Sequence, residues 1–233
     1  QFYVKYEKQF LYVAAVMEQA PESIVANQLV QGKPMWSDDY VGVIIDPTND
    51  KSDAYLFHVS PNSVREDGLV ENRSYIREWQ GIWLAQSKIT DTGWVAEIAI
   101  PVQTISFDQD VTDWGIQFRR KVSNPMKQYF WNLNEPGVSG WSARQVGTAS
   151  GIRDMDPGVG VDIRPSLAVK DRSFDDTADF DKLNPSIDAF YKITPSLTAA
   201  VTINTDFSGT DVDDQQVNLS RFSLFLPEKR DFF

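Results

Sequence analysis

The stretch W-S-D-D-Y-V-G-V-I-I-D-P-T-N-D-K-S-D-A-Y-L-F-H-V, residues 36–59, decides the fold of this chain. Two apolar runs rich in β-branched and aromatic residues, Tyr40 to Ile45 and Ala54 to Val59, flank a polar, acidic turn over residues 46–53. This pattern predicts a β-hairpin with a long loop. Because the first run is almost entirely apolar, we expect a strand buried on both faces, at the centre of a sandwich rather than at its edge.

Further short strand-like runs, separated by Gly, Pro and Asp turns, lie on both sides of this hairpin. They occupy residues 2–6, 10–17, 79–88, 94–100, 114–122 and 128–133. A loop-rich excursion is expected over Pro61 to Arg77, with a turn at Asp67-Gly68. Regularly spaced strands of this kind predict an all-β, antiparallel sandwich or barrel.

Beyond Gly151 the pattern changes, so we divide the chain into residues 1–151 and 152–233. Apolar residues alternate with small or polar ones over 159–170, 187–193 and 197–204, around an acidic stretch at 171–181 and a turn at 194–196. Long alternating runs joined by short turns are typical of outer-membrane barrel strands. An ordinary antiparallel sheet with one wet face produces the same pattern.

The composition excludes several classes of function. The chain has 233 residues, with 22 Lys plus Arg against 33 Asp plus Glu and a formal net charge of -11. This acid excess argues against a nucleic-acid partner and suits a neutral ligand, a cation site or an extracellular surface. Cysteine is absent, so disulfides and thiolate chemistry are excluded. No apolar segment is long enough to predict a membrane-spanning helix.

Five stretches of the first part resemble carbohydrate-binding module family 9 in order and spacing. They are L-Y-V-A-A-V at 11–16, W-S-D-D-Y-V-G-V-I-I-D at 36–46, G-W-V-A-E-I-A-I-P at 93–101, W-G-I-Q-F-R-R at 114–120 and W-S-A-R-Q-V-G-T-A-S-G at 141–151. The resemblance implies a family-9-like antiparallel β-sandwich over residues 1–151, and carbohydrate as the partner.

The last part resembles a different kind of domain. The string N-T-D-F-S-G-T-D-V-D-D-Q-Q-V-N-L-S-R-F-S-L-F-L-P-E-K-R-D-F-F, residues 204–233, is similar to a domain of unknown function that follows such modules in bacterial outer-membrane proteins. This implies that residues 152–233 begin an outer-membrane barrel, and that the protein lies at the bacterial outer membrane, on its periplasmic or cell-surface side. Because the chain starts and ends within strand-like patterns, we expect a fragment of a longer protein.

The resemblance also implies a sugar site. Family 9 clamps a terminal sugar between two tryptophans, and Trp36 and Trp141 fall at these positions. A pyranose packs its C–H face on an aromatic ring, while its hydroxyls need polar partners. At the positions of such partners the chain has Gly42 in place of an acid, and His58 and Ser60 in place of an arginine and an asparagine, so we expect the site to lose much of its discrimination between sugars. The alternative is that both tryptophans are buried and close the sandwich.

Oxygen-bearing side chains gather around the hairpin. They are Asp38, Asp39, Asp46, Asn49, Asp50 and Asp53. Calcium takes several such oxygens from irregular loops, and family 9 holds structural calcium, so we expect a calcium site among the first five. The alternative is that these residues act as turn formers, and their spacing is not that of an EF-hand.

Three functional hypotheses follow. The first is a non-catalytic carbohydrate-binding module of a bacterial outer-membrane or cell-surface protein. The second is a structural or plug domain of an outer-membrane barrel with no sugar site. The third is an accessory part of a polysaccharide hydrolase, although no acid stands in a recognisable catalytic context. Exposure of the rings of Trp36 and Trp141 would favour the first hypothesis over the second.

Overall fold

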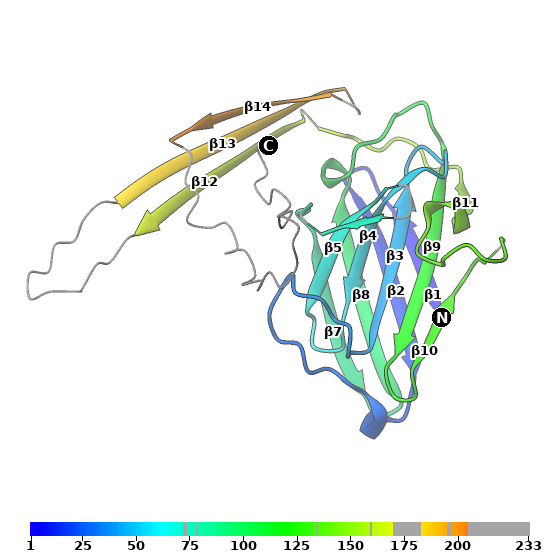
Figure 1. The fold of residues 1–233 in the computed structure, drawn as a ribbon. Coiled ribbons are helices and arrows are strands. Elements are labelled where there is room, and N and C mark those ends of the chain that lie inside the picture. The colour runs from blue at the N-terminus through cyan, green and yellow to red at the C-terminus, as the bar shows by residue number, and fades with distance from the viewer. Residues whose placement is uncertain are drawn as a thin grey trace, which may run out of the picture. The chain divides into compact units, whose positions relative to one another are not determined.

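The computed structural model describes residues 1–71, 74–77, 79–133, 135–158, 160–169, 183–194 and 197–204 (Figure 1). The chain divides into two compact units, Gln1–Gly158 and Val159–Phe233. Strands make up almost all the regular structure of the described residues, together with the 3-10 turns η1 (Pro21–Ser23), η2 (Val102–Thr104) and η3 (Ala143–Gln145). The predicted all-β, antiparallel fold class is therefore confirmed.

The first unit is a sandwich of two antiparallel sheets. One sheet has the order β1-β2-β8-β7, formed by β1 (Phe2–Tyr6), β2 (Phe10–Glu18), β8 (Gly93–Pro101) and β7 (Leu84–Thr90). The other has the order β10-β9-β3-β4-β5-β6, formed by β10 (Lys127–Phe130), β9 (Asp113–Val122), β3 (Tyr40–Asp46), β4 (Asp53–Val59), β5 (Arg65–Glu71) and β6 (Ser74–Ile76), with β11 (Gly147–Ser150) also paired to β9. The hairpin β3–β4 lies in the middle of this second sheet, as its sequence predicts.

The main core fills the space between the two sheets. Alternate residues of β8, from Trp94 to Ile100, are buried against inward-facing residues of β3 and β4, such as Val43 and Phe57. Glu97, on the opposite face of β8, is exposed, as the alternation of a strand with one buried face requires. Ile152 and Met155 also belong to this core, so the first unit continues a little beyond Gly151.

The strand β3 is buried along its whole length, on both faces. Its inward residues join the main core, while Ile44 on the outer face packs in a second, smaller cluster. That cluster also contains Ala143 and Val146 from the segment before β11, with Tyr75 and Trp141 packed against it. A central strand with both faces covered explains why the run from Tyr40 is almost entirely apolar.

Two sequence predictions in this sheet are wrong. Residues expected to form a loop-rich excursion instead form β5 and β6, and Asp67-Gly68 lies inside β5 without turning. The reason is that β5 carries polar residues on its covered face. Its sequence therefore lacks the alternation of apolar and polar residues that predicts a strand. Gly68 is required because a Cβ there would lie 2.4 Å from Cε2 of Tyr75, so the glycine gives the tyrosine ring its place against the sheet.

The second unit is described only in part. It contains the antiparallel sheet β12-β13-β14, formed by β12 (Val161–Val169), β13 (Leu183–Thr194) and β14 (Leu197–Ile203). The predicted alternation is confirmed, because the exposed large apolar side chains include Ile163, Ile187 and Val201 on one face while Asp162 and Asp188 lie on the other.

Several predictions about the second unit fall outside the described residues or remain predictions. The acidic stretch 171–181, the residues 195 and 196 of the predicted turn, and nearly all of the signature string 204–233 lie outside the described part. An outer-membrane location remains a prediction. Within the described residues, no helix has the length and apolar character needed to cross a membrane.

The sandwich core gives a direct test of the fold. Replacing Ile100, which is fully buried, with alanine should lower the free energy of unfolding by about 2–5 kcal/mol, because it leaves a cavity between the sheets. Ile82→Ala is the matched control, since Ile82 is 65% exposed and its truncation should change stability by less than about 0.5 kcal/mol. Urea unfolding followed by fluorescence measures both; equal effects would contradict this placement of β8.

Candidate functional site

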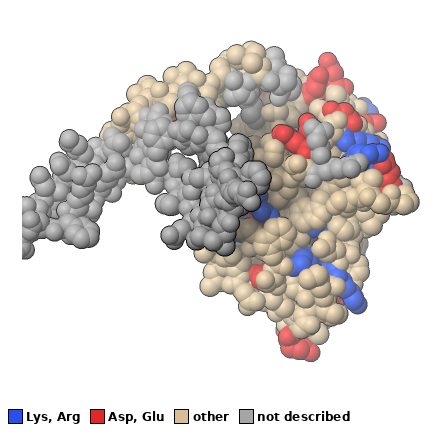
Figure 2. Space-filling model, viewed as in Figure 1, with Lys and Arg blue, Asp and Glu red and all other residues tan. Residues whose placement is uncertain are grey.

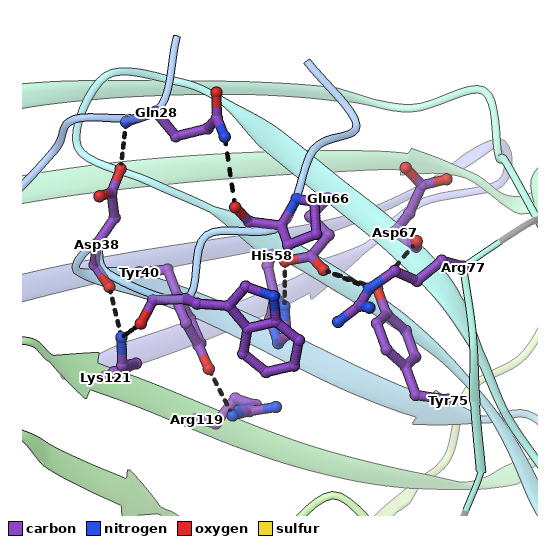
Figure 3. A network of polar contacts seen from close by, with 12 residues as sticks. Gln28, Asp38, Tyr40, His58, Glu66, Asp67, Tyr75, Arg77, Arg119 and Lys121 are labelled. Carbon is purple, nitrogen blue, oxygen red and sulfur yellow. Dashed lines mark hydrogen bonds and ion pairs between the residues drawn. The ribbon is translucent and has the colours of Figure 1, made fainter. Parts of the chain in front are cut away.

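A row of polar side chains crosses the outer face of the larger sheet. The strand register places Arg119 of β9 opposite Gly42 of β3, Gly42 opposite His58 of β4, and His58 opposite Glu66 of β5. Directly opposed residues in a sheet share a face, so the three side chains project to the same side. Figure 3 shows this group with the residues around it.

The gap left by Gly42 is filled by the imidazole of His58. A Cβ at Gly42 would lie 2.2 Å from Cδ2 of His58 and 2.4 Å from the carbonyl oxygen of Phe57. No larger side chain fits this position without moving the neighbouring strand. The resemblance to family 9 implies an acid at the position of Gly42. The absence of that acid here goes together with the presence of His58, whose ring occupies the space.

His58 is fully buried beneath aromatic rings. Its ring lies 4.6 Å from that of Tyr40 and 5.3 Å, edge-on, from that of Trp141. Burial and, to a smaller extent, the nearby charge of Arg119 together lower the pKa of His58 to about 4, although contact with Glu66 opposes the shift. His58 is therefore neutral at pH 7.

Glu66 links this buried histidine to the surface. Its carboxylate lies 3.7 Å from Nδ1 of His58 and 3.3 Å from Nε of Arg77, and the hydroxyl of Tyr75 also donates to it. Burial raises the pKa of Glu66, but its contacts with His58 and Arg77 outweigh burial and hold it below the ordinary value. The carboxylate is therefore ionised and holds Arg77 in place.

Arg119 is a buried cation stacked between rings. It is 1% exposed, and its Cζ atom lies 3.1 Å from the ring centroid of Trp141 and 5.2 Å from that of Tyr40. Its Nη2 donates a hydrogen bond of 2.7 Å to the hydroxyl of Tyr40, whereas Nε and Nη1 have no hydrogen-bond partner among the described residues. Burial lowers the pKa of Arg119 to about 10, so it stays charged at neutral pH.

The two tryptophans predicted to clamp a sugar lie at different depths on this face. Trp36 is 64% exposed, and the guanidinium of Arg77 lies over its ring at 4.6 Å. Trp141 is half-buried on Arg119. Arg77 also lies 4.8 Å from the ring of Tyr75, which is 5.9 Å from that of Trp141. The structure thus connects the two tryptophans through Arg77 and Tyr75.

The two predicted polar partners of the sugar lie below the surface. Ser60 is buried, and its hydroxyl oxygen accepts a hydrogen bond of 3.2 Å from the backbone N–H of Val64. His58 is covered by Tyr40 and Trp141, as described above. In this structure neither residue offers an atom to solvent, and their contact with sugar remains a prediction.

A lysine ammonium anchors the segment that carries Trp36. Lys121 is buried, and its Nζ donates to the carbonyl oxygens of Trp36 and Asp38 and to the hydroxyl of Ser123. Burial lowers the pKa of Lys121, and the carboxylates of Asp39 and Asp38 oppose this shift. One cation therefore satisfies two carbonyls of the same loop and fixes the base of the Trp36 side chain.

The residues proposed to bind calcium separate into two groups at opposite ends of β3. Asp38 and Asp39 precede this strand, whereas Asp46 is its last residue and Asn49 and Asp50 lie in the β3–β4 loop. A strand of this length at about 3.3 Å per residue sets Asp39 and Asp46 roughly 20 Å apart. The five residues therefore cannot share one ion.

In both groups the carboxylates accept hydrogen bonds from N–H donors. Asp38 accepts from the backbone of Gln28, and Asp39 from the backbone of Ser123. At the other end of the strand, Asp46 accepts from backbone N–H groups of the loop through both oxygens, and Asp50 accepts from Ser52, the behaviour of turn formers. The described residues contain no group of three His, Asp or Glu side chains that could hold a metal ion. This donor set does not fit a calcium cage, and calcium binding remains a prediction.

Comparison with known proteins supports the fold. No protein-family model matches the chain, and no curated protein matches it by sequence. A solved structure of a Bacteroides uniformis protein to which carbohydrate binding is ascribed aligns with a TM-score of 0.51 at 14% identity, covering 64% of this chain and 76% of that one. At this identity the likeness shows a shared fold.

Two further solved structures belong to a family 9 carbohydrate-binding module from Caldicellulosiruptor kristjanssonii. One is a complex with glucose and the other a complex with cellotriose, both with a TM-score of 0.44. Their sequence identities to this chain are 16% and 17%, respectively. Each alignment covers 64% of this chain, and the two alignments cover 74% and 72% of the module chains.

Sequence reasoning missed the cations of this site. Arg77 and its partner Glu66 both lie in the stretch 61–77, which was predicted to be rich in loops. In the structure Glu66 belongs to the strand β5. Arg119 belongs to a strand that was predicted, and its alternation with inward-facing Phe118 could have placed it on the outer face. Nothing in the sequence indicates that this face is covered by Trp141.

The role of Lys121 can be tested by removing its charge while keeping most of its volume. Lys121→Met leaves two loop carbonyls without their donor, so we expect the free energy of unfolding to fall by about 1–3 kcal/mol. Lys127→Met, at an exposed position of the neighbouring strand β10, is the control and should have little effect. Thermal or urea unfolding measures the stability of both variants. A Lys121→Met protein that is as stable as the wild type would contradict the anchoring role.

The buried histidine predicts a specific dependence of stability on pH. Because the pKa of His58 falls from about 6.5 in the unfolded chain to about 4 in the folded one, the unfolded chain binds more protons between these values. Its contribution to stability is therefore complete above pH 6.5 and is lost as the pH falls toward 4. Urea unfolding at pH 7.5 and at pH 5.0 measures this effect. The free energy of unfolding should fall more between these two pH values for the wild type than for His58→Asn. An equal fall for both proteins would refute a buried neutral histidine.

Proposed function

We propose that the first unit is a non-catalytic carbohydrate-binding module that binds sugar on the outer face of the larger sheet, beside Trp36. The observation that carries this proposal is the exposed indole of Trp36, fixed in place by Arg77 on its ring and by Lys121 on its backbone. A rigid exposed ring loses little conformational entropy when a ligand stacks on it.

Carbohydrate suits this surface for a chemical reason. The C–H face of a pyranose packs on an indole ring, and its hydroxyls need fixed polar groups close by. Arg77 supplies donors next to the ring of Trp36, and Tyr75 and Trp141 extend the aromatic surface. The likeness in fold to the Bacteroides uniformis protein supports the same function, although fold alone does not determine function.

A second candidate is a structural domain without a sugar site. The burial of His58 and Ser60 and the half-buried state of Trp141 favour it, because these positions then complete the packing of the sheet. The exposed ring of Trp36 opposes it. The two functions differ in whether any saccharide changes the environment of Trp36.

The test is a titration of intrinsic tryptophan fluorescence with mono-, oligo- and polysaccharides. For a sugar that binds, Trp36→Ala and Trp141→Ala should each weaken binding by about tenfold or more, because aromatic platforms dominate such contacts. Trp131→Ala is the matched control: Trp131 is 59% exposed but packs beside Phe118, which faces the other side of the sheet. It should leave the affinity unchanged.

The opposite result is equally clear. If no saccharide changes the fluorescence while all three variants remain folded by circular dichroism, the sandwich has a structural role. If the Trp131 variant weakens binding as much as the Trp36 variant does, the sugar lies elsewhere on the sandwich.

A further inference from the structure

A small cavity lies beside Arg77, the residue whose guanidinium stacks on Trp36. It has a volume of about 190 Å³, and its lining includes Arg65, Arg77, Asp67 and the side-chain amides of Gln31 and Gln80. Arg77 joins the cavity to the proposed sugar surface, because the same guanidinium stacks on Trp36. This volume is below the roughly 300 Å³ at which sites for drug-sized ligands begin, so it suits one sugar ring rather than a chain.

The cavity is positively charged in an acidic protein. The chain as a whole has a net charge of -11, and Figure 2 shows acidic and basic side chains interspersed over the visible face of the first unit. Two guanidinium groups nevertheless face one carboxylate in this cavity. That carboxylate, Asp67, accepts a hydrogen bond of 2.6 Å from the backbone N–H of Gly81, and burial raises its pKa. The hydrogen bond from Gly81 opposes the effect of burial on this pKa, and the positive excess comes from the lining itself, in which Arg65 and Arg77 face the one carboxylate of Asp67.

The two arginines differ in how far their donors are used. Arg65 donates from Nη1 to the carbonyl oxygen of Trp83 and from Nε to Gln31. Arg77 uses Nε to bind Glu66, and its two terminal nitrogens have no hydrogen-bond partner among the described residues. Its side chain is 37% exposed. Arg77 therefore presents a partly exposed fork of donors that no described residue occupies.

The buried row beneath adds one cation, Arg119, and one carboxylate, Glu66, so the cavity and the row together contain three arginines and two carboxylates among the described residues. Arg77 and Arg119 share the single carboxylate of Glu66, while His58 is neutral. Nε and Nη1 of Arg119 are buried without an acceptor, and uncompensated buried charge is unfavourable. An anion bound above Glu66, at Arg77, would lower this electrostatic cost as well as satisfy the free donors.

We propose that this site selects a sugar that carries a carboxylate, a uronic acid, with its carboxylate on the terminal nitrogens of Arg77 and its ring against Trp36. The planar guanidinium matches a carboxylate through two parallel hydrogen bonds. Gln80 is an amide in the lining able to bind a hydroxyl, whereas the amide of Gln31 is used by Arg65 and Ser63. This inference rests on the proposed function and names the class of sugar that the module takes.

The experiment compares two ligands that differ only at C6: cellotriose and the trimer of β-1,4-linked glucuronic acid. Calorimetry at low salt should show the acidic trimer binding about tenfold more tightly, the gain expected of one charge-assisted contact. The advantage should shrink at high salt because the charges are partly exposed. These measurements need only the wild-type protein.

Variants then assign the effect to Arg77. Arg77→Gln should bring the two trimers to equal affinity, because it weakens both but takes the charge-assisted contact from the acidic trimer alone, and Arg77→Lys should restore part of the preference. Arg153→Gln, which removes an exposed arginine elsewhere in the unit, is the control and should keep the full preference. A trimer of 6-sulfated glucose separates charge from shape, and tighter binding of the sulfated trimer would overturn the assignment of a carboxylate.

The two proposals fail in different ways. Cellotriose binding at least as tightly as the acidic trimer, with Trp36→Ala abolishing both, would overturn the uronic acid inference and leave the carbohydrate-binding module intact. Binding of neither trimer nor any other saccharide would overturn the proposed function itself.

Discussion

The burial of β3 on both faces is the constraint on which the rest of the first unit depends. Its inner face is covered by the opposite sheet, but its outer face is covered by other means: rings, a loop and β6. Side chains that project from the neighbouring strands on that outer face are therefore buried too, whatever their polarity. Arg119, His58 and Glu66 lie in this layer, where each needs a partner because water is excluded.

The way these polar groups are satisfied produces the candidate site. Glu66 compensates only part of the charge of Arg119 and Arg77, and aromatic rings provide the remaining stabilisation of both guanidinium groups. The same contacts hold Trp36 and Trp141 in fixed positions. The candidate site and the packing of the sheet are thus one structure, in which a stacked, partly exposed arginine lies beside an exposed ring.

Sequence reasoning succeeded where apolar periodicity is strong. The strands β2, β3, β4, β8 and β9 have clear apolar patterns and lie within a residue or two of their predicted limits. The prediction failed for β5 and β6, whose polar residues and glycine are explained by contacts with Tyr75 and Arg77 that no local pattern contains. The pair Trp36 and Trp141 came from a resemblance, and the structure adds that Arg77 and Tyr75 connect them.

The sequence alone determined the all-β class, the central hairpin and the inward face of the sandwich, because a strand's own alternation specifies which side chains avoid water. Only the tertiary structure decided the electrostatics of the outer face. Arg119, His58, Glu66 and Arg77 come from separate strands or their edges, and their burial, their charge and their free donors depend on register and on the rings above them. Such properties arise from distances between segments remote in sequence, which local patterns do not encode.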